Sequence, residues 1–349
     1  MRFRSISALV AMTILPLLTA AAPVTSVTID DGEARAVLSI LHKLQSKAPV
    51  AQSDWTALFA TEGYRRLKQR EADFKRAFSD DDFKAFVTSP ELVAKTADLQ
   101  RTLDAWSTQN LSAMEARART YLPQGAQLKA TVYPLIKPKT NSFVYQLDTN
   151  PAIMLYIDPA KTGDQFSNTV SHELLHVGDA ENCPPAAIAA SESSFTPAQK
   201  AFHEWLGAFG EGWAVLAAAG GPNVHPHWED PPRERTVWDT AMSHYNGDFA
   251  DLESFFASIA DGKLTGDAIP AKGFTYFGTD QGPWYTVGYK MDVTIEHELG
   301  RPALIASLCD NRTYLSTYDT AAQRENVRGA HLPVWPTPLT TFLETKGGS

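Results

Sequence analysis

The chain has 349 residues, of which 44% are hydrophobic and 20% are charged, enough to bury one or two sizeable cores. This composition excludes a small disulfide-stapled scaffold and a disordered chain. Lys and Arg number 31 against 40 Asp and Glu, so the formal net charge is −9, and no long basic run offsets it. We therefore expect no nucleic-acid partner.

The amino-terminal end has the pattern of a secretory signal peptide. Arg2 and Arg4 precede an apolar run over residues 6–18, and small residues follow it. About 13 apolar residues are too few to span a bilayer of about 30 Å, and no later stretch reaches about 18. We predict a signal peptide over residues 1–22, cleaved near Ala21 or Ala22, and an exported protein, periplasmic or secreted, without a stable membrane span.

Two cysteines, Cys183 and Cys309, remain in the mature chain. In an oxidising compartment they are compatible with a single disulfide. Two separate buried thiols are the alternative, because spacing in the sequence does not show whether two side chains meet.

Helical signals dominate the first third of the chain. From Asp31 to about Tyr121, apolar residues recur at spacings of three and four. Ser89 and Pro90 have the pattern of an N-cap followed by proline at the first helical position, and Ser53-Asp54 stands before Trp55, Leu58 and Phe59 in the same way. We predict an N-terminal helical region over residues 23–121.

A change of period follows. Residues 130–133, 143–145 and 153–156 are rich in β-branched and aromatic side chains, which predicts three short strands. Pro134 favours an edge position for the first strand, because proline donates no ladder hydrogen bond. Helical patterns return over residues 167–177, 196–219 and 284–299. The order of helices, small sheet and helices predicts an α+β fold, mainly helical, with a second region over residues 122–349.

The pentapeptide from His172 to His176, His-Glu-Leu-Leu-His, carries the chemistry. On a helix, residues four apart lie on one face, so both imidazoles can reach one metal ion. Glu173 lies beside the metal without being a ligand, where it can act as a general base on water. Zinc suits this chemistry because it lowers the pKa of its bound water to about 7.

A zinc site needs a third protein ligand. The metzincin histidine six positions after His176 is absent, because that place is Asn182. Glu211 lies between two glycines in Phe-Gly-Glu-Gly-Trp-Ala, and the glycines let the backbone approach its surroundings closely. Glu211 can therefore complete a site of two histidines and one glutamate, in which the fourth coordination position of the metal stays open for water. Glu204, seven residues earlier, is the rival ligand. We predict His172, His176 and Glu211 as ligands of one Zn²⁺ per chain.

These motifs resemble the gluzincin group of zinc metallopeptidases. Together with the later segments Tyr285-Thr-Val-Gly-Tyr-Lys-Met and Leu299-Gly-Arg-Pro-Ala-Leu, they resemble an uncharacterised bacterial family of zinc-dependent peptidases, over about residues 127–318. The resemblance implies a zincin-like domain with the ligands above, Glu173 as general base and an edge strand above the metal that pairs with extended substrate. Gly178 departs from the pattern, because a hydrophobic residue usually closes the motif.

The oxyanion of peptide hydrolysis needs a hydrogen-bond donor besides the metal. Tyr285 and Tyr289 are the predicted catalytic tyrosines, four residues apart on one helical face; buried tyrosines in an ordinary core are the alternative. His225 and His227, on a loop, are further candidates for substrate contact. Asp179 is a candidate partner for the second ring nitrogen of His176, and a plain helix-end carboxylate is equally compatible.

The sequence thus predicts an exported zinc metallopeptidase that acts on a peptide or protein substrate. Two alternatives stay open. One is a secreted metal-containing binding protein without activity, against which the intact Glu173 argues. The other is a zinc amidase that acts on cell-wall cross-links or another non-protein amide, since the chemistry at the metal is the same.

Overall fold

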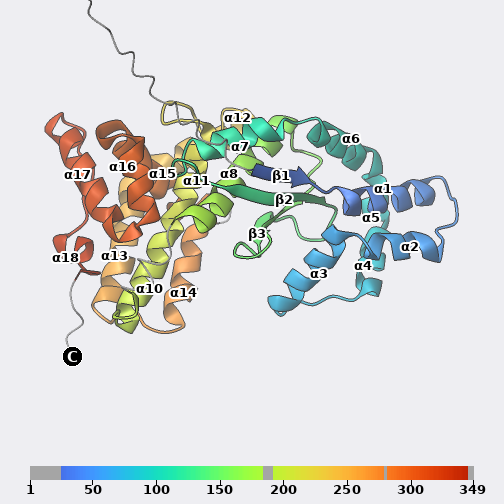
Figure 1. Ribbon diagram of the computed structural model, residues 1–349, viewed down its shortest axis with the longest axis horizontal. Helices are drawn as coiled ribbons and strands as arrows, with labels where there is room; N and C mark the ends of the chain where they lie inside the picture. Colours follow the sequence, from blue (N-terminus) through green and yellow to red (C-terminus); the bar gives the residue numbers. More distant parts are fainter. Residues whose placement is uncertain (1–24, 184–191, 279–280, 345–349) are drawn as a thin grey trace, which may run out of the picture.

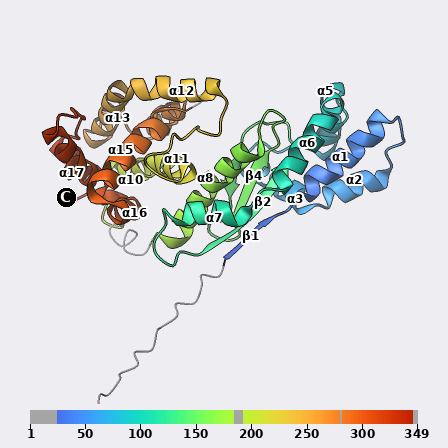
Figure 2. The same ribbon diagram turned by 90° about the horizontal axis from the view of Figure 1, so that it is seen from above.

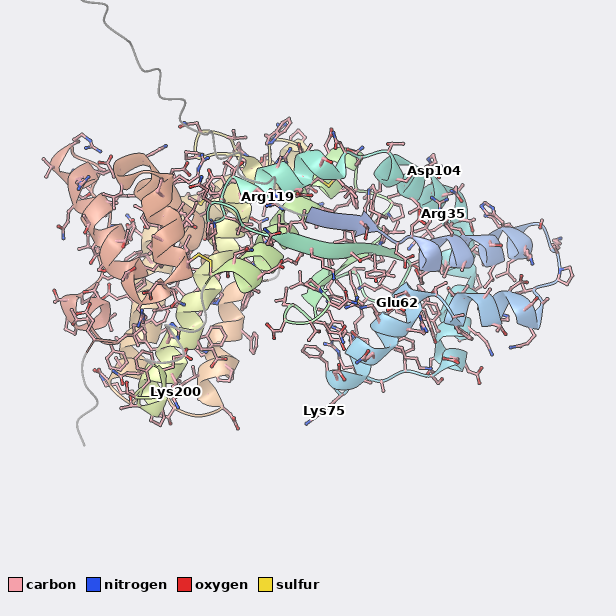
Figure 3. All side chains as sticks on the ribbon, viewed as in Figure 1. Arg35, Glu62, Lys75, Asp104, Arg119 and Lys200 are labelled. Atoms are coloured by element: carbon pink, nitrogen blue, oxygen red, sulfur yellow. A yellow bond between two sulfur atoms is a disulfide. The ribbon has the colours of Figure 1, made fainter. Side chains whose placement is uncertain are left out.

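The computed structural model describes residues 25–183, 192–278 and 281–344. The fold is α+β and mainly helical, which confirms the predicted class. Figures 1 and 2 show an elongated molecule, with most helices of the first third at one end, a small sheet in the middle and the last helices at the other end. Charged side chains such as those of Lys75 and Lys200 lie on the outside (Figure 3). The segment predicted as a signal peptide lies outside the described residues.

Short helices form the first third, as predicted. At the start of α5, Ser89 accepts a hydrogen bond from the Leu92 N–H, and Pro90 is the first helical residue. The helix around Trp55 begins earlier than expected, at Gln52, because the Asp54 carboxylate accepts the Ala51 N–H at 2.8 Å from inside the first turn. The helices are α1 (Gly32–Gln45), α2 (Gln52–Phe59), α3 (Glu62–Asp73), α4 (Asp80–Val87), α5 (Pro90–Ala94), α6 (Thr96–Ser107) and α7 (Leu111–Arg119).

The sheet contains the three predicted strands and one more. They are β2 (Leu128–Leu135), β3 (Phe143–Tyr145) and β4 (Ala152–Tyr156), preceded by β1 (Thr25–Ile29), in the order β1-β2-β4-β3. The pairs β1–β2 and β2–β4 are parallel, and β3 is antiparallel to β4. Strand β1 belongs to the stretch predicted as helical, yet it pairs with a strand about a hundred residues later. The boundary at residues 121 and 122 stays a prediction.

The prediction that Pro134 marks an edge strand is wrong, because β2 lies between β1 and β4. Hydrogen bonds alternate between the two sides of a strand, and the Val132 carbonyl faces β1, where it accepts the Asp30 N–H at 2.9 Å. Pro134 faces the same side, two residues beyond the last pair, Ile29 with Val132. The strand therefore tolerates proline here because β1 has already ended.

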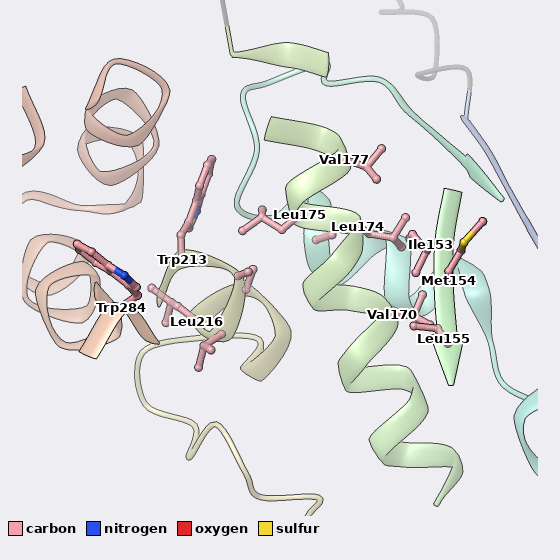
Figure 4. Close-up of a cluster of buried hydrophobic side chains, with 14 of the residues drawn as sticks. Ile153, Met154, Leu155, Val170, Leu174, Leu175, Val177, Trp213, Leu216 and Trp284 are labelled. Carbon is pink, nitrogen blue, oxygen red and sulfur yellow. The ribbon is translucent and has the colours of Figure 1, made fainter. Parts of the chain in front are cut away.

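Helix α8 (Gly163–Asn182) begins with a capping box between Thr162 and Gln165 and packs on the sheet. Figure 4 shows Val170 and Leu174 directed at the side chains of β4, whereas Leu175 lies on the other side of the helix, towards Trp213. All four side chains are buried. Gly178, which the motif pattern left unexplained, also lies in this interface: a Cβ there would lie 2.2 Å from Leu122. The leucine occupies the space that a larger residue at 178 would take.

The last half of the described chain is a group of helices around α11 and α15. Cys183, which caps the end of α8, is disulfide-bonded to Cys309 at the end of α16, with Cα atoms 4.7 Å apart. This confirms the single disulfide and excludes two separate thiols. The helices are α10 (Pro197–Leu206), α11 (Gly210–Ala219), α12 (Pro232–Ser243), α13 (Tyr245–Ala260), α14 (Ala268–Gly273), α15 (Pro283–Leu299), α16 (Arg301–Cys309), α17 (Tyr314–Val327) and α18 (Thr337–Thr340), with 3₁₀ turns η1 (Gly207–Phe209), η2 (Phe274–Phe277) and η3 (Asn311–Thr313).

Helices α11 and α15 touch backbone to backbone. A Cβ at Gly212 would lie 2.1 Å from the Tyr289 nitrogen and 2.3 Å from the Gly288 carbonyl carbon, whereas a Cβ at Gly210 would meet nothing within 4 Å. The two glycines that flank Glu211 therefore differ in function. Only Gly212 is required by close packing.

We expect Gly212→Ala to lower the free energy of unfolding by about 1–3 kcal/mol or more, because the methyl group must push two helix backbones apart. Gly210→Ala is the matched control and should leave stability unchanged or slightly raised, as alanine favours helices. Urea unfolding of both variants beside the wild type checks this. An equal effect of the two substitutions would contradict the packing argument.

Candidate metal centre and active site

Two histidines of α8 and one glutamate of α11 meet at a single point. The His172 and His176 Nε2 atoms lie 3.2 Å apart, and the Glu211 Oε2 atom lies 3.2 Å from the first and 3.4 Å from the second. Each side chain is about a fifth exposed, at 19%, 22% and 21%. The fold thus brings the three predicted ligands together at a point that solvent can reach. Glu211 on α11 is at least 35 residues away in the sequence from the two histidines on α8.

The backbone contact at Gly212 positions Glu211. The turn η1 leads into α11, so Glu211 lies in the first turn of that helix, whose remaining residues are almost all buried. Because Gly212 lies against the backbone of α15, the start of α11 is held between α15 and α8. A glutamate on a rigid helix end keeps its carboxylate at a fixed distance from both imidazoles.

The three side chains fit a tetrahedral zinc ion. With ligand bonds of about 2.0–2.1 Å and tetrahedral angles, ligand atoms lie about 3.3–3.4 Å apart, close to the observed separations. The ionisation of the cluster also suits a metal cation. Burial acts against ionisation of both His176 and Glu211, but their mutual attraction raises the pKa of His176 to about 9 and holds the pKa of Glu211 far below its usual range. The carboxylate is therefore ionised and ready to bind a cation.

The rival ligand Glu204 and the candidate supporting residue Asp179 are not part of the ligand cluster. Glu204, the rival third ligand, is exposed on α10 and is not part of the cluster. Asp179 lies beside the disulfide, with a carboxylate oxygen within 4.8 Å of both sulfur atoms. Burial raises the pKa of Asp179 to about 6, and the charge of His176 opposes this shift. Its assignment as the partner of His176 stays a prediction.

A cavity of about 270 Å³ opens beside the ligand cluster. His172, Glu173 and Tyr285 line it, together with residues of the loop between α11 and α12. Burial raises the pKa of Glu173, and the charges of the two histidines oppose this shift. Glu173 thus presents a carboxyl group to the cavity from the turn of α8 that carries both imidazoles. Among the described lining residues, none comes from the edge strands β1 and β3. Pairing of extended substrate with an edge strand therefore stays a prediction.

The structure separates the two candidate tyrosines. The Tyr285 ring lies 6.4 Å from that of His172, between centroids, and lines the cavity. Burial and the charges of Glu211 and Glu173 raise its pKa well above the usual value, so the hydroxyl keeps its proton at neutral pH. Tyr289 donates to the Val224 carbonyl at 3.4 Å and is not among the cavity-lining residues. Of the pair, Tyr285 alone lies where a substrate carbonyl could reach it.

The two loop histidines are separated in the same way. His227 lines the cavity, with Nδ1 2.5 Å from the Asp230 carboxylate and Nε2 3.0 Å from Gln281 Oε1. His225 does not line it; its Nε2 lies 3.1 Å from Asp239, and its Nδ1 accepts the His227 N–H. His225 therefore shapes the loop, and His227 presents its ring to the cavity.

Sequence reasoning missed the polar residues that fasten this loop to α8. Gln165 donates to Asp230 at 2.5 Å, and Asn168 donates to the Pro226 carbonyl at 3.1 Å. Both lie on the helix face of His172, at spacings of seven and four residues, so helical periodicity was a usable signal. Asp230 and Gln281 had no such signal, because only the fold brings their loops to α8.

Comparison with known protein families assigns the chain. A family model described as "Putative zinc dependent peptidase (DUF5700)" matches residues 55–327, a wider range than the motifs span and one that includes most helices of the first third. No curated protein and no solved structure matches the chain. None of the helices in the described part of the chain has both the length and the hydrophobicity needed to cross a bilayer. The family match covers well over half of the sequence, so the chain belongs to this family of peptidases, for which zinc is the cofactor and peptides are the substrates.

Proposed function

We propose that the protein is a peptidase of the gluzincin group, in which His172, His176 and Glu211 hold one zinc ion and Glu173 is the general base. The observation that carries the proposal is the meeting of three ligand atoms within 3.2–3.4 Å of one another, beside a cavity that Glu173 lines. Two histidines and one glutamate leave a fourth coordination position open, as hydrolysis requires.

A zinc ion held by His172, His176 and Glu211 would supply a Lewis acid for the scissile carbonyl and would lower the pKa of bound water to about 7. Glu173 takes a proton from the attacking water and later delivers it to the leaving amine. The raised pKa of Glu173 supports both steps, because a carboxylate that binds protons more tightly than an exposed glutamate is a better base.

The negative charge that forms on the substrate oxygen needs donors that are already in place. Tyr285 keeps its proton at neutral pH and lines the cavity, so it is the proposed hydrogen-bond donor to this oxygen. His227 also lines the cavity, where its contacts with Asp230 at 2.5 Å and Gln281 at 3.0 Å fix the position of the ring. Both groups line the cavity with Glu173 and require no rearrangement of the helices.

We also propose that the mature chain is exported after cleavage near Ala21 or Ala22. The disulfide between Cys183 and Cys309 supports this proposal, because disulfides persist in oxidising compartments and are rare in the cytosol.

Zinc content tests the ligand set. We expect one zinc per chain in the purified wild type and in Glu204→Gln, the matched control at an exposed position of α10, and loss of zinc from Glu211→Gln after light dialysis. Removing a direct ligand should weaken binding by more than the about 10–100-fold that follows from losing a residue that only orients a ligand. Elemental analysis measures this. A wild type that holds no zinc after reconstitution, or equal losses in both variants, would refute the assignment.

Activity tests the general base. Glu173→Gln should lower kcat by about 10²–10⁴-fold while zinc content stays at one per chain, because the amide cannot accept the proton. Glu181→Gln, on an exposed position of the same helix, is the control and should keep full activity. The assay uses a folded protein, a mixed peptide library and isolated cell-wall material, since cleavage of wall material alone would replace the peptidase proposal with the amidase. Substantial peptidase activity in the Glu173 variant would sink the mechanism.

The two tyrosines provide their own matched pair. Tyr285→Phe should lower kcat by about 10²-fold, because it removes one donor to the oxyanion, whereas Tyr289→Phe should change kcat little. Steady-state kinetics on one peptide measures both. If the Tyr289 variant loses as much activity as the Tyr285 variant, the hydroxyl of Tyr285 has no special function.

A further inference from the structure

Lys161 lies at the cleft in a position that the proposed mechanism does not use. It stands in the connection between β4 and α8, and its backbone N–H donates to the Asp158 carbonyl at 2.9 Å. Its exposed side chain lines the cavity next to the metal ligands and also a second cavity of about 320 Å³. The two cavities share Lys161, His227, Asp230 and Gln281, so they form one cleft that runs from the ligand cluster past the start of α8 to α12, where Arg233 and Glu234 line its outer part.

The charge of Lys161 is unmatched. It is the only Lys or Arg among the described residues that line the cavity at the metal site, and within the described ranges it forms no ion pair. Asp230 is a carboxylate of the same cleft on which the charge of Lys161 acts. Burial would raise the pKa of Asp230, but its hydrogen bonds to His227 and Gln165, together with the charge of Lys161, lower it. That carboxylate is already held by two donors at 2.5 Å each.

The other polar side chains of this wall are also occupied. Asn168 donates to the Pro226 carbonyl, Gln281 contacts His227, and Thr169 donates to the Gln165 carbonyl. Their hydrogen-bonding groups hold the wall together. Among the described residues that line the cavity at the metal site, Lys161 is left as the exposed cation without an ion pair, available to a ligand.

The distance between the metal ligands and Lys161 determines which residue of a bound peptide could contact the lysine. Helix α8 begins at Gly163, so His172 lies about 13–14 Å further along its axis, and the flexible lysine side chain can shorten that span. An extended peptide covers about 3.3 Å per residue. A substrate group that contacts the ammonium therefore lies about two to four residues from the scissile bond.

We infer that Lys161 is a specificity-determining residue that binds a carboxylate of the substrate, two to four residues from the cleaved bond. This inference rests on the proposed peptidase function. The carboxylate is an Asp or Glu side chain or the α-carboxylate at the end of a short peptide, which share the same chemistry. The overall charge of −9 does not prevent this, because salt screens charges beyond about 10 Å and the local lysine decides.

Matched peptides test the inference on the full mature zinc enzyme. One series contains Glu or Gln three residues from the cleaved bond, and the other ends in a free acid or an amide. We expect the wild type to prefer the carboxylate in at least one series by about tenfold to a hundredfold in kcat/KM, the range of a charge-assisted hydrogen bond. Preference in the first series assigns the carboxylate to a side chain, and preference in the second assigns it to the chain end. Absence of preference in both overturns the inference.

Variants then connect the preference to the residue. Lys161→Met should lower the ratio of kcat/KM for carboxylate over neutral peptide to near one, and Lys161→Arg should keep most of this preference. The control is Lys200→Met, at an exposed position on α10 (Figure 3), which should leave the ratio unchanged. If Lys161→Met keeps the ratio, the lysine is not the determinant.

A binding measurement separates this inference from the peptidase proposal. Calorimetry of the uncleaved Glu and Gln peptides on the Glu173→Gln protein reports recognition without turnover. Weaker binding of the Glu peptide after adding Lys161→Met would support the lysine assignment even if no peptide were hydrolysed. Equal binding of this pair, together with equal binding of the free-acid and amide peptides measured in the same way, would overturn the assignment even in an active enzyme.

Discussion

The structure depends on helix α8, which packs on the sheet with one side and presents the two histidines on another. Along one side of α8, Val170 and Leu174 are buried against the sheet, and this apolar contact fixes the rotation of the helix about its axis. The same rotation places His172 and His176 on the side that faces α11. Since the two sides are related by the helical period, packing on the sheet and presentation of the imidazoles cannot be changed independently.

The position of the third ligand, Glu211, depends on a backbone contact between α11 and α15. Glycine at 212 lets the backbone of α11 lie directly against that of α15, and the first turn of α11 then points Glu211 at the two imidazoles. The disulfide between Cys183 and Cys309 ties the far end of α8 to the C-terminal helices. The two elements that carry the ligands are thus connected both by close packing near the site and by a covalent link away from it.

The cleft combines polar groups that hold its walls together with groups that line its interior. Gln165 and Asn168 hold the loop that carries His227, whereas Glu173, Tyr285 and Lys161 present groups to the cavity. This division has a physical reason, because a polar side chain that is held by hydrogen bonds within the protein positions a wall, whereas a group that lines the cavity can contact a substrate. The proton transfer, oxyanion contact and carboxylate recognition that we propose thereby involve different groups of one cleft.

Much of the site was readable in the sequence, because its signals are local. The spacing of His172, Glu173 and His176 follows from the helical period, the glycines around Glu211 indicate close backbone packing, and the strand and helix patterns give the fold class. The tertiary structure alone decided three other points. Strand β1 joins the sheet through a partner about a hundred residues away, Tyr285 and Tyr289 share a helical face but point to different surroundings, and Lys161 reaches the cleft only because two loops converge on α8. Local periodicity determines which side chains share a face of one element, but long-range packing determines what that face meets.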